Sequence, residues 1–62
     1  MTNPTIIKFE DLDTSDEALA IVRFDDASVV VGLSLKKGAD VQVVMNKEKA
    51  KELIEALKKA VE

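Results

Sequence analysis

Residues Ala27–Met45 read ASVVVGLSLKKGADVQVVM, and this stretch decides the fold of the 62-residue chain. Two runs rich in β-branched residues flank a Lys-Lys-Gly turn, which is typical of a β-hairpin. Gly38 can adopt the positive φ that a three-residue hairpin loop with a bulge requires. The register that follows pairs Leu35 with Ala39, Leu33 with Val41, and Val31 with Val43.

The preceding segment, Glu17–Phe24 (EALAIVRF), is compatible with a helix or a strand. Its Ala and Leu residues suit a helix that Thr14 or Ser15 could cap, but its second half prefers a strand. We favour the strand, because a two-residue turn at Asp25 and Asp26 would join it to the next strand as a hairpin. The expected pairs are Phe24 with Ala27, Val22 with Val29, and Ala20 with Val31.

The first residues of the chain give weaker indications of secondary structure. Thr5–Phe9 (TIIKF) is β-rich and is expected to form a short strand, either within the chain or exchanged between copies. Glu10–Asp16 is polar and turn-forming, so we expect a loop there. Residues 1–4 are expected to be a disordered leader, and no signal peptide is recognised.

Strand alternation sorts the side chains onto two faces, which a one-residue slip of register would exchange. One face, called here the apolar face, collects Ala20, Val22, Phe24, Val29, Val31, Leu33, Leu35, Val41, Val43 and Met45. The opposite face, called the mixed face, collects Leu19, Ile21, Arg23, Ser28, Val30, Gly32, Ser34, Gln42 and Val44.

A C-terminal amphipathic helix is expected over residues 46–62, with Asn46 as its N-cap. Glu48 in the first turn and Lys58 and Lys59 in the last complement the helix dipole. Its apolar residues recur at helical spacing and form the helix stripe, which is Ala50, Leu53, Ile54, Leu57, Ala60 and Val61. We expect this stripe to cover the apolar face.

The sequence therefore predicts one α+β domain over residues 1–62. Its architecture is a three- or four-stranded antiparallel β-meander with one C-terminal amphipathic helix packed on one face.

Composition restricts the function. The chain has no His and no Cys, so we expect neither a cofactor nor a metal site, and a catalytic site is not expected. With a net charge of −3 and no basic face, nucleic-acid binding is not expected. No apolar run approaches the roughly 18 residues of a membrane span. The lack of Cys suits a reducing compartment, so we expect a cytoplasmic protein.

The acidic run that begins at Asp11 resembles the start of a calcium-binding loop. The EF-hand pattern requires Gly at its sixth position and Glu at its twelfth. These positions hold Asp16 and Val22, so the pattern fails where the turn and the bidentate ligand are needed. A solvated loop is the simpler interpretation.

The mixed face leads to the main functional hypothesis. Two apolar-rich faces and a single helix leave one face without a cover. A chain of this length is also only marginally stable alone. We therefore expect a homodimer or higher homo-oligomer, a non-catalytic protein–protein interaction module, with Leu19, Ile21, Val30 and Val44 buried between subunits.

An alternative hypothesis uses the acidic residues. Between Glu10 and Asp26 there are seven acidic residues and one basic residue. If the long loop and the first hairpin turn lay at the same end of the sheet, they would form a negative patch that could block a basic site on another protein, as an inhibitor or nucleic-acid mimic does. The residues of this patch are Asp11, Asp13, Asp16, Asp25 and Asp26.

Overall fold

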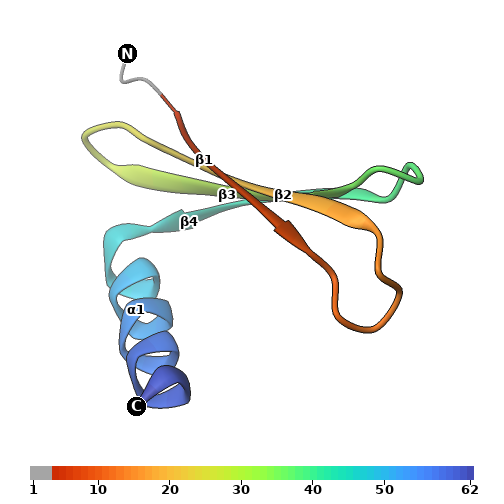
Figure 1. Ribbon diagram of the computed structural model, residues 1–62. Helices are drawn as coiled ribbons and strands as arrows, with labels where there is room; N and C mark the ends of the chain where they lie inside the picture. The colour runs from red at the N-terminus through yellow and green to blue at the C-terminus, as the bar shows by residue number, and fades with distance from the viewer. Residues whose placement is uncertain (1–3) are drawn as a thin grey trace.

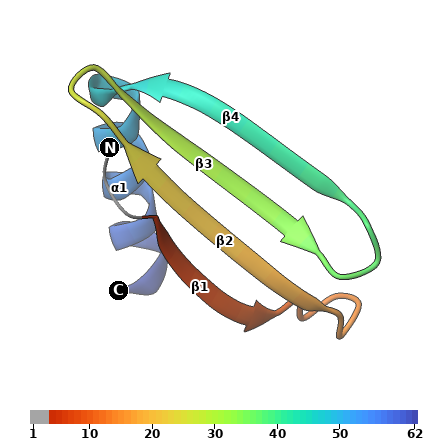
Figure 2. The same ribbon diagram turned by 90° about the horizontal axis from the view of Figure 1, so that it is seen from above.

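The computed structural model describes residues 4–62 as a four-stranded antiparallel sheet followed by one helix (Figure 1). The elements are β1 (Thr5–Glu10), β2 (Glu17–Phe24), β3 (Ser28–Leu35), β4 (Asp40–Asn46) and α1 (Lys47–Val61). The strands lie side by side in chain order (Figure 2). The predicted α+β class and meander are confirmed. The leader expected at residues 1–4 lies, apart from Pro4, outside the described residues.

The β3–β4 hairpin has the predicted register. Leu33 pairs with Val41, and the Leu35 amide donates a 2.8 Å hydrogen bond to the carbonyl of Ala39. Gly38 has a φ of 103°, a conformation that L-residues with a Cβ rarely adopt. The turn chemistry of the sequence therefore determined this pairing.

The β2–β3 hairpin differs from its predicted register by two residues. Phe24 pairs with Val29 instead of the predicted Ala27, and the same shift applies along both strands. The turn moves because Asp25 Oδ1 accepts hydrogen bonds from the amides of Ala27 and Ser28, at 2.9 and 2.8 Å. A shift of two preserves the alternation of side chains, so both predicted faces are retained.

β1 pairs with β2 of the same chain and makes the sheet four-stranded. Through this register, Ile7 and Phe9 join the apolar face, whereas Ile6 and Lys8 join the mixed face. Both faces are therefore larger than the sequence indicated.

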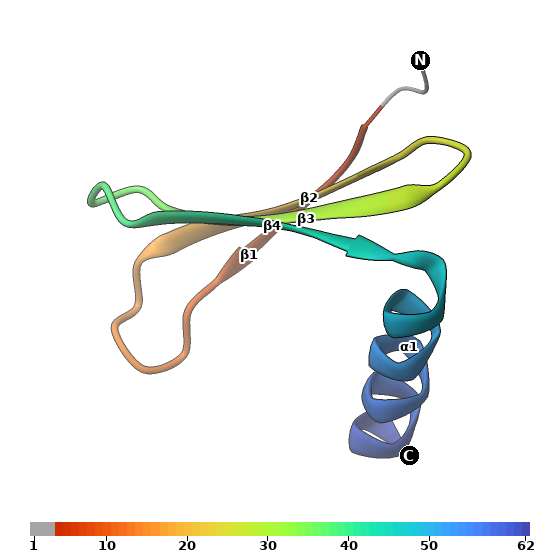
Figure 3. The same ribbon diagram turned by 180° about the vertical axis from the view of Figure 1, so that it is seen from behind.

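The helix leaves the sheet at one end and extends away from it (Figure 3). The Asn46 side chain caps it by accepting a 2.9 Å hydrogen bond from the Lys49 amide. Among the described strands, α1 has Cα neighbours within 8 Å only in β3 and β4. The Lys47 ammonium lies 5.3 Å from the centre of the Phe24 ring, which belongs to the apolar face. The helix thus packs against the sheet near its first turn, and the rest of its stripe leaves most of the apolar face exposed.

This arrangement buries very little. Among residues 4–62, Ala18 is the one buried hydrophobic residue, at 5% exposure, where it lies between Phe9 on β1 and Leu35 on β3. The chain exposes 5285 Å², whereas a compact protein of 6.8 kDa exposes about 4,000 Å². Its radius of gyration is 12.7 Å, against about 10.5 Å expected for a compact domain of this length. The fold is therefore a single open layer with roughly 1,300 Å² of excess surface.

Replacing Gly38 by Ala should destabilise the fold by about 1–2 kcal/mol, because a Cβ is strained at this positive φ although the space around it is open. Denaturant unfolding at one fixed protein concentration measures the change. Gly32→Ala is the matched control, since its added Cβ would lie 3.8 Å from the nearest atom, an ordinary contact. Equal stability losses in the two variants would contradict the assigned role of Gly38.

Candidate interaction surfaces

The structure brings the four predicted interface residues onto the mixed face. Val30 and Val44 are direct cross-strand partners on β3 and β4, and Leu19 and Ile21 follow each other along β2. Leu19, Ile21 and Val30 are half-buried in the chain alone, whereas Val44 is exposed. Ile6, the partner of Ile21, extends this patch and was not predicted because the register of β1 was unknown.

Polar groups interrupt the mixed face. The Arg23 guanidinium donates a 2.9 Å hydrogen bond to Gln42 Oε1, and this bond joins β2 to β4 across β3. At the end of the sheet opposite to the helix, Lys36 and Glu17 form a 2.9 Å ion pair. The mixed face is therefore partly covered by its own charged and amide side chains.

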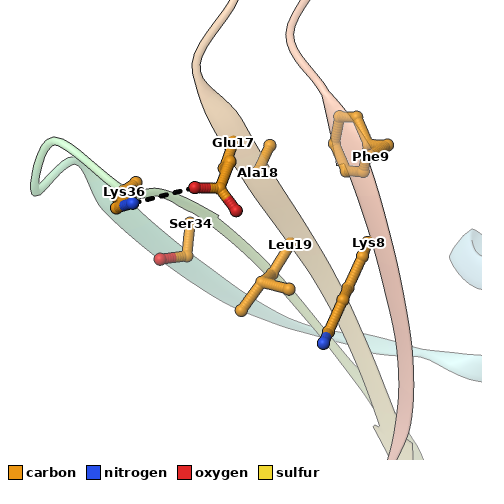
Figure 4. Close-up of a pocket in the computed structure, with 7 residues that line it drawn as sticks. All are labelled: Lys8, Phe9, Glu17, Ala18, Leu19, Ser34 and Lys36. Carbon is orange, nitrogen blue, oxygen red and sulfur yellow. Dashed lines mark hydrogen bonds and ion pairs between the residues drawn. The ribbon is translucent and has the colours of Figure 1, made fainter.

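A shallow hollow of about 300 Å³ lies at that end of the sheet (Figure 4). Its lining residues are Lys8, Phe9, Glu17, Ala18, Leu19, Ser34 and Lys36. The side chains of the Lys36–Glu17 pair that borders it are 74% and 77% exposed, so water solvates both charges. An exposed pair of this kind is worth little in energy and holds neither partner rigidly.

The apolar face has a different character. Six of its large side chains, from all four strands, are each 46–56% exposed, namely Ile7, Phe9, Phe24, Leu33, Val41 and Val43. The large residues of the helix stripe are also exposed, from 40% at Leu53 to 83% at Val61. Exposed large hydrophobic side chains are thus concentrated on this face and on the stripe, and such concentrations often mark an interaction surface.

The acidic residues do not form one patch. β2 separates the β1–β2 loop, which holds Asp11, Asp13 and Asp16, from the β2–β3 turn, which holds Asp25 and Asp26. Figure 2 shows the loop and the turn at opposite ends of the sheet. The condition that the sequence hypothesis set for an acidic surface is therefore not met, since a strand of eight residues lies between the two groups.

Several of these carboxylates take part in local structure. Asp11 Oδ1 accepts a 2.9 Å hydrogen bond from the Asp13 amide. The Asp16 side chain is only 16% exposed and lies 3.5 Å from the Lys37 ammonium. In the part of the chain that the structure describes, no cluster of three or more acidic side chains is arranged to hold a metal ion.

Asp25 differs from the other acidic residues because local hydrogen bonds clearly lower its pKa. Hydrogen bonds from the amides of Ala27 and Ser28 and from the Ser28 hydroxyl lower the pKa of Asp25, and the charge of Lys47 adds to the effect. The carboxylate stabilises the turn, which explains why the turn is centred one residue later than predicted.

Comparisons with family models, with curated proteins and with solved structures found no match to this chain. Over residues 4–62, the chain has no helix with the length and hydrophobicity that a bilayer crossing requires. The surfaces described above are therefore the basis on which a function can be proposed.

The lowered pKa of Asp25 predicts a pH dependence of stability. Because its folded-state pKa lies below the usual 3.8, its stabilising contribution is present above that value and disappears as the pH falls through the lowered pKa. Asp25→Asn should therefore flatten the acid-side loss of stability, measured as thermal midpoints from about pH 6 to about pH 2. Asp26→Asn removes a neighbouring carboxylate that makes none of these hydrogen bonds and serves as the matched control. Identical profiles for the two variants would contradict this role of Asp25.

Proposed function

We propose that this protein is a non-catalytic module that functions through protein–protein contact, and that its first partner is a second copy of itself. The observation that carries the proposal is the excess of exposed surface, roughly 1,300 Å² above that of a compact protein of this mass. Obligate dimers bury about 2,000–5,000 Å² in total, or roughly 1,000–2,500 Å² on each subunit. The excess on one chain is therefore enough for a stable dimer.

Composition supports the same proposal. Small domains that bury little usually depend on a disulfide, a metal or self-association. A sequence without Cys or His has no disulfide and none of the usual zinc ligands, so self-association is the stabilisation that suits it. The cysteine-free composition also favours a reducing compartment such as the cytoplasm as its setting.

The solution mass tests the proposal. At micromolar concentration, light scattering should give twice the 6.8 kDa of one chain. The thermal midpoint should also rise with protein concentration, because folding and association are coupled when the monomer has almost no core. A mass of one chain together with a midpoint that does not depend on concentration would refute self-association.

A further inference from the structure

We infer that the second copy covers the apolar face, and that the helix stripe of each subunit lies across the apolar face of the other. This inference rests on the proposed self-association and adds where the copies meet. It differs from the expectation formed from sequence, which placed the interface on the mixed face.

Charge distinguishes the two faces. Within the described strands, every residue of the apolar face is uncharged, and Thr5, the partner of Val22, is its one polar member. The mixed face carries Lys8, Glu17 and Arg23 and the hydrogen bond across β3. Burying charged groups costs free energy unless each finds a partner, so the apolar face is the easier one to remove from water.

Exposure points to the same face. Six large side chains of the apolar face are 46–56% exposed, whereas the mixed face has two exposed large hydrophobic residues within the described strands, Ile6 and Val44. The expectation for the mixed face assumed that the chain's own helix covers the apolar face. Since α1 contacts only β3 and β4 among the described strands, that assumption does not hold for most of this surface.

The length of the helix suits the role of a cover. Fifteen residues of α-helix extend about 22 Å. Four strands spaced about 4.8 Å apart place the outer strand axes about 14 Å from each other. A helix from another copy is therefore long enough to cross all four strands, whereas the helix of the same chain extends away from its own sheet (Figure 1).

The proposed dimer is a closed assembly because the contact between its two copies is reciprocal. Each chain has one largely exposed apolar face and one largely exposed helix stripe, so a two-fold axis would cover both surfaces of both copies at once. Such an isologous contact ends at two subunits and gives no open filament.

Two neighbouring residues of β4 provide a matched test. Val43 belongs to the apolar face and Val44 to the mixed face, with exposures of 47% and 64% in the single chain. Val43→Lys should shift the mass at micromolar concentration from two chains to one, because it places an ammonium inside the interface. Val44→Lys should leave the dimer intact, since its ammonium would stay in water.

Other outcomes of this pair overturn the inference. If the dimer survives Val43→Lys, or if Val44→Lys disrupts it equally or more, the interface does not lie on the apolar face. Self-association itself would not be contradicted by either result. A wild-type mass of one chain would instead refute the proposed function, so the two failures can be told apart.

Cysteine pairs provide a milder test if Val43→Lys does not fold. The chain has no native Cys, so every disulfide formed would be an engineered one. Mixing Leu57→Cys chains with differently tagged Val41→Cys chains under mild oxidation should give a covalent heterodimer, because the stripe of one copy lies on the apolar face of the other. Val44→Cys replaces Val41→Cys in the control and should give several-fold less product. Equal yields, or a higher yield with Val44→Cys, would overturn the inference.

Discussion

The constraint on which this structure depends is that a single antiparallel layer has two faces and residues 4–62 supply only one helix. Packing within a sheet can bury a small side chain between larger neighbours, as at Ala18, but it cannot bury the large side chains that point out of the layer. Hydrophobic stabilisation is proportional to the apolar area removed from water. Most of that area is still in water in the single chain, so packing within the chain supplies only a small part of the hydrophobic stabilisation that burial of these side chains could give.

Local chemistry made the strands predictable. Gly38 specifies the β3–β4 turn because its positive φ suits few other residues, and the register follows from the turn. The β2–β3 turn was harder, because two adjacent aspartates offer two possible positions. The hydrogen bonds that Asp25 accepts from Ala27 and Ser28 select the later one. The faces were still predicted correctly, since the error in pairing was an even number of residues.

The candidate surfaces were predictable to a different degree. Alternation was enough to group Leu19, Ile21, Val30 and Val44 on one face, and the structure brings them onto that face. The split of the acidic residues also followed from the sequence once Glu17–Phe24 was taken as a strand, because a strand separates its two flanking loops. The direction of the helix did not follow. Periodicity reveals which residues form an apolar stripe, but not whether the stripe meets its own sheet or that of another molecule.

The junction between β4 and α1 accounts for the direction of the helix. Asn46 ends the strand by capping the helix, and Lys47 contacts the Phe24 ring on the apolar side. No residue separates the strand from the helix, so the helix has little freedom to fold back along its own sheet. A longer connection would let the stripe cover the apolar face of the same chain. The direct connection keeps most of the stripe away from the sheet of its own chain, and the proposed dimer depends on this feature.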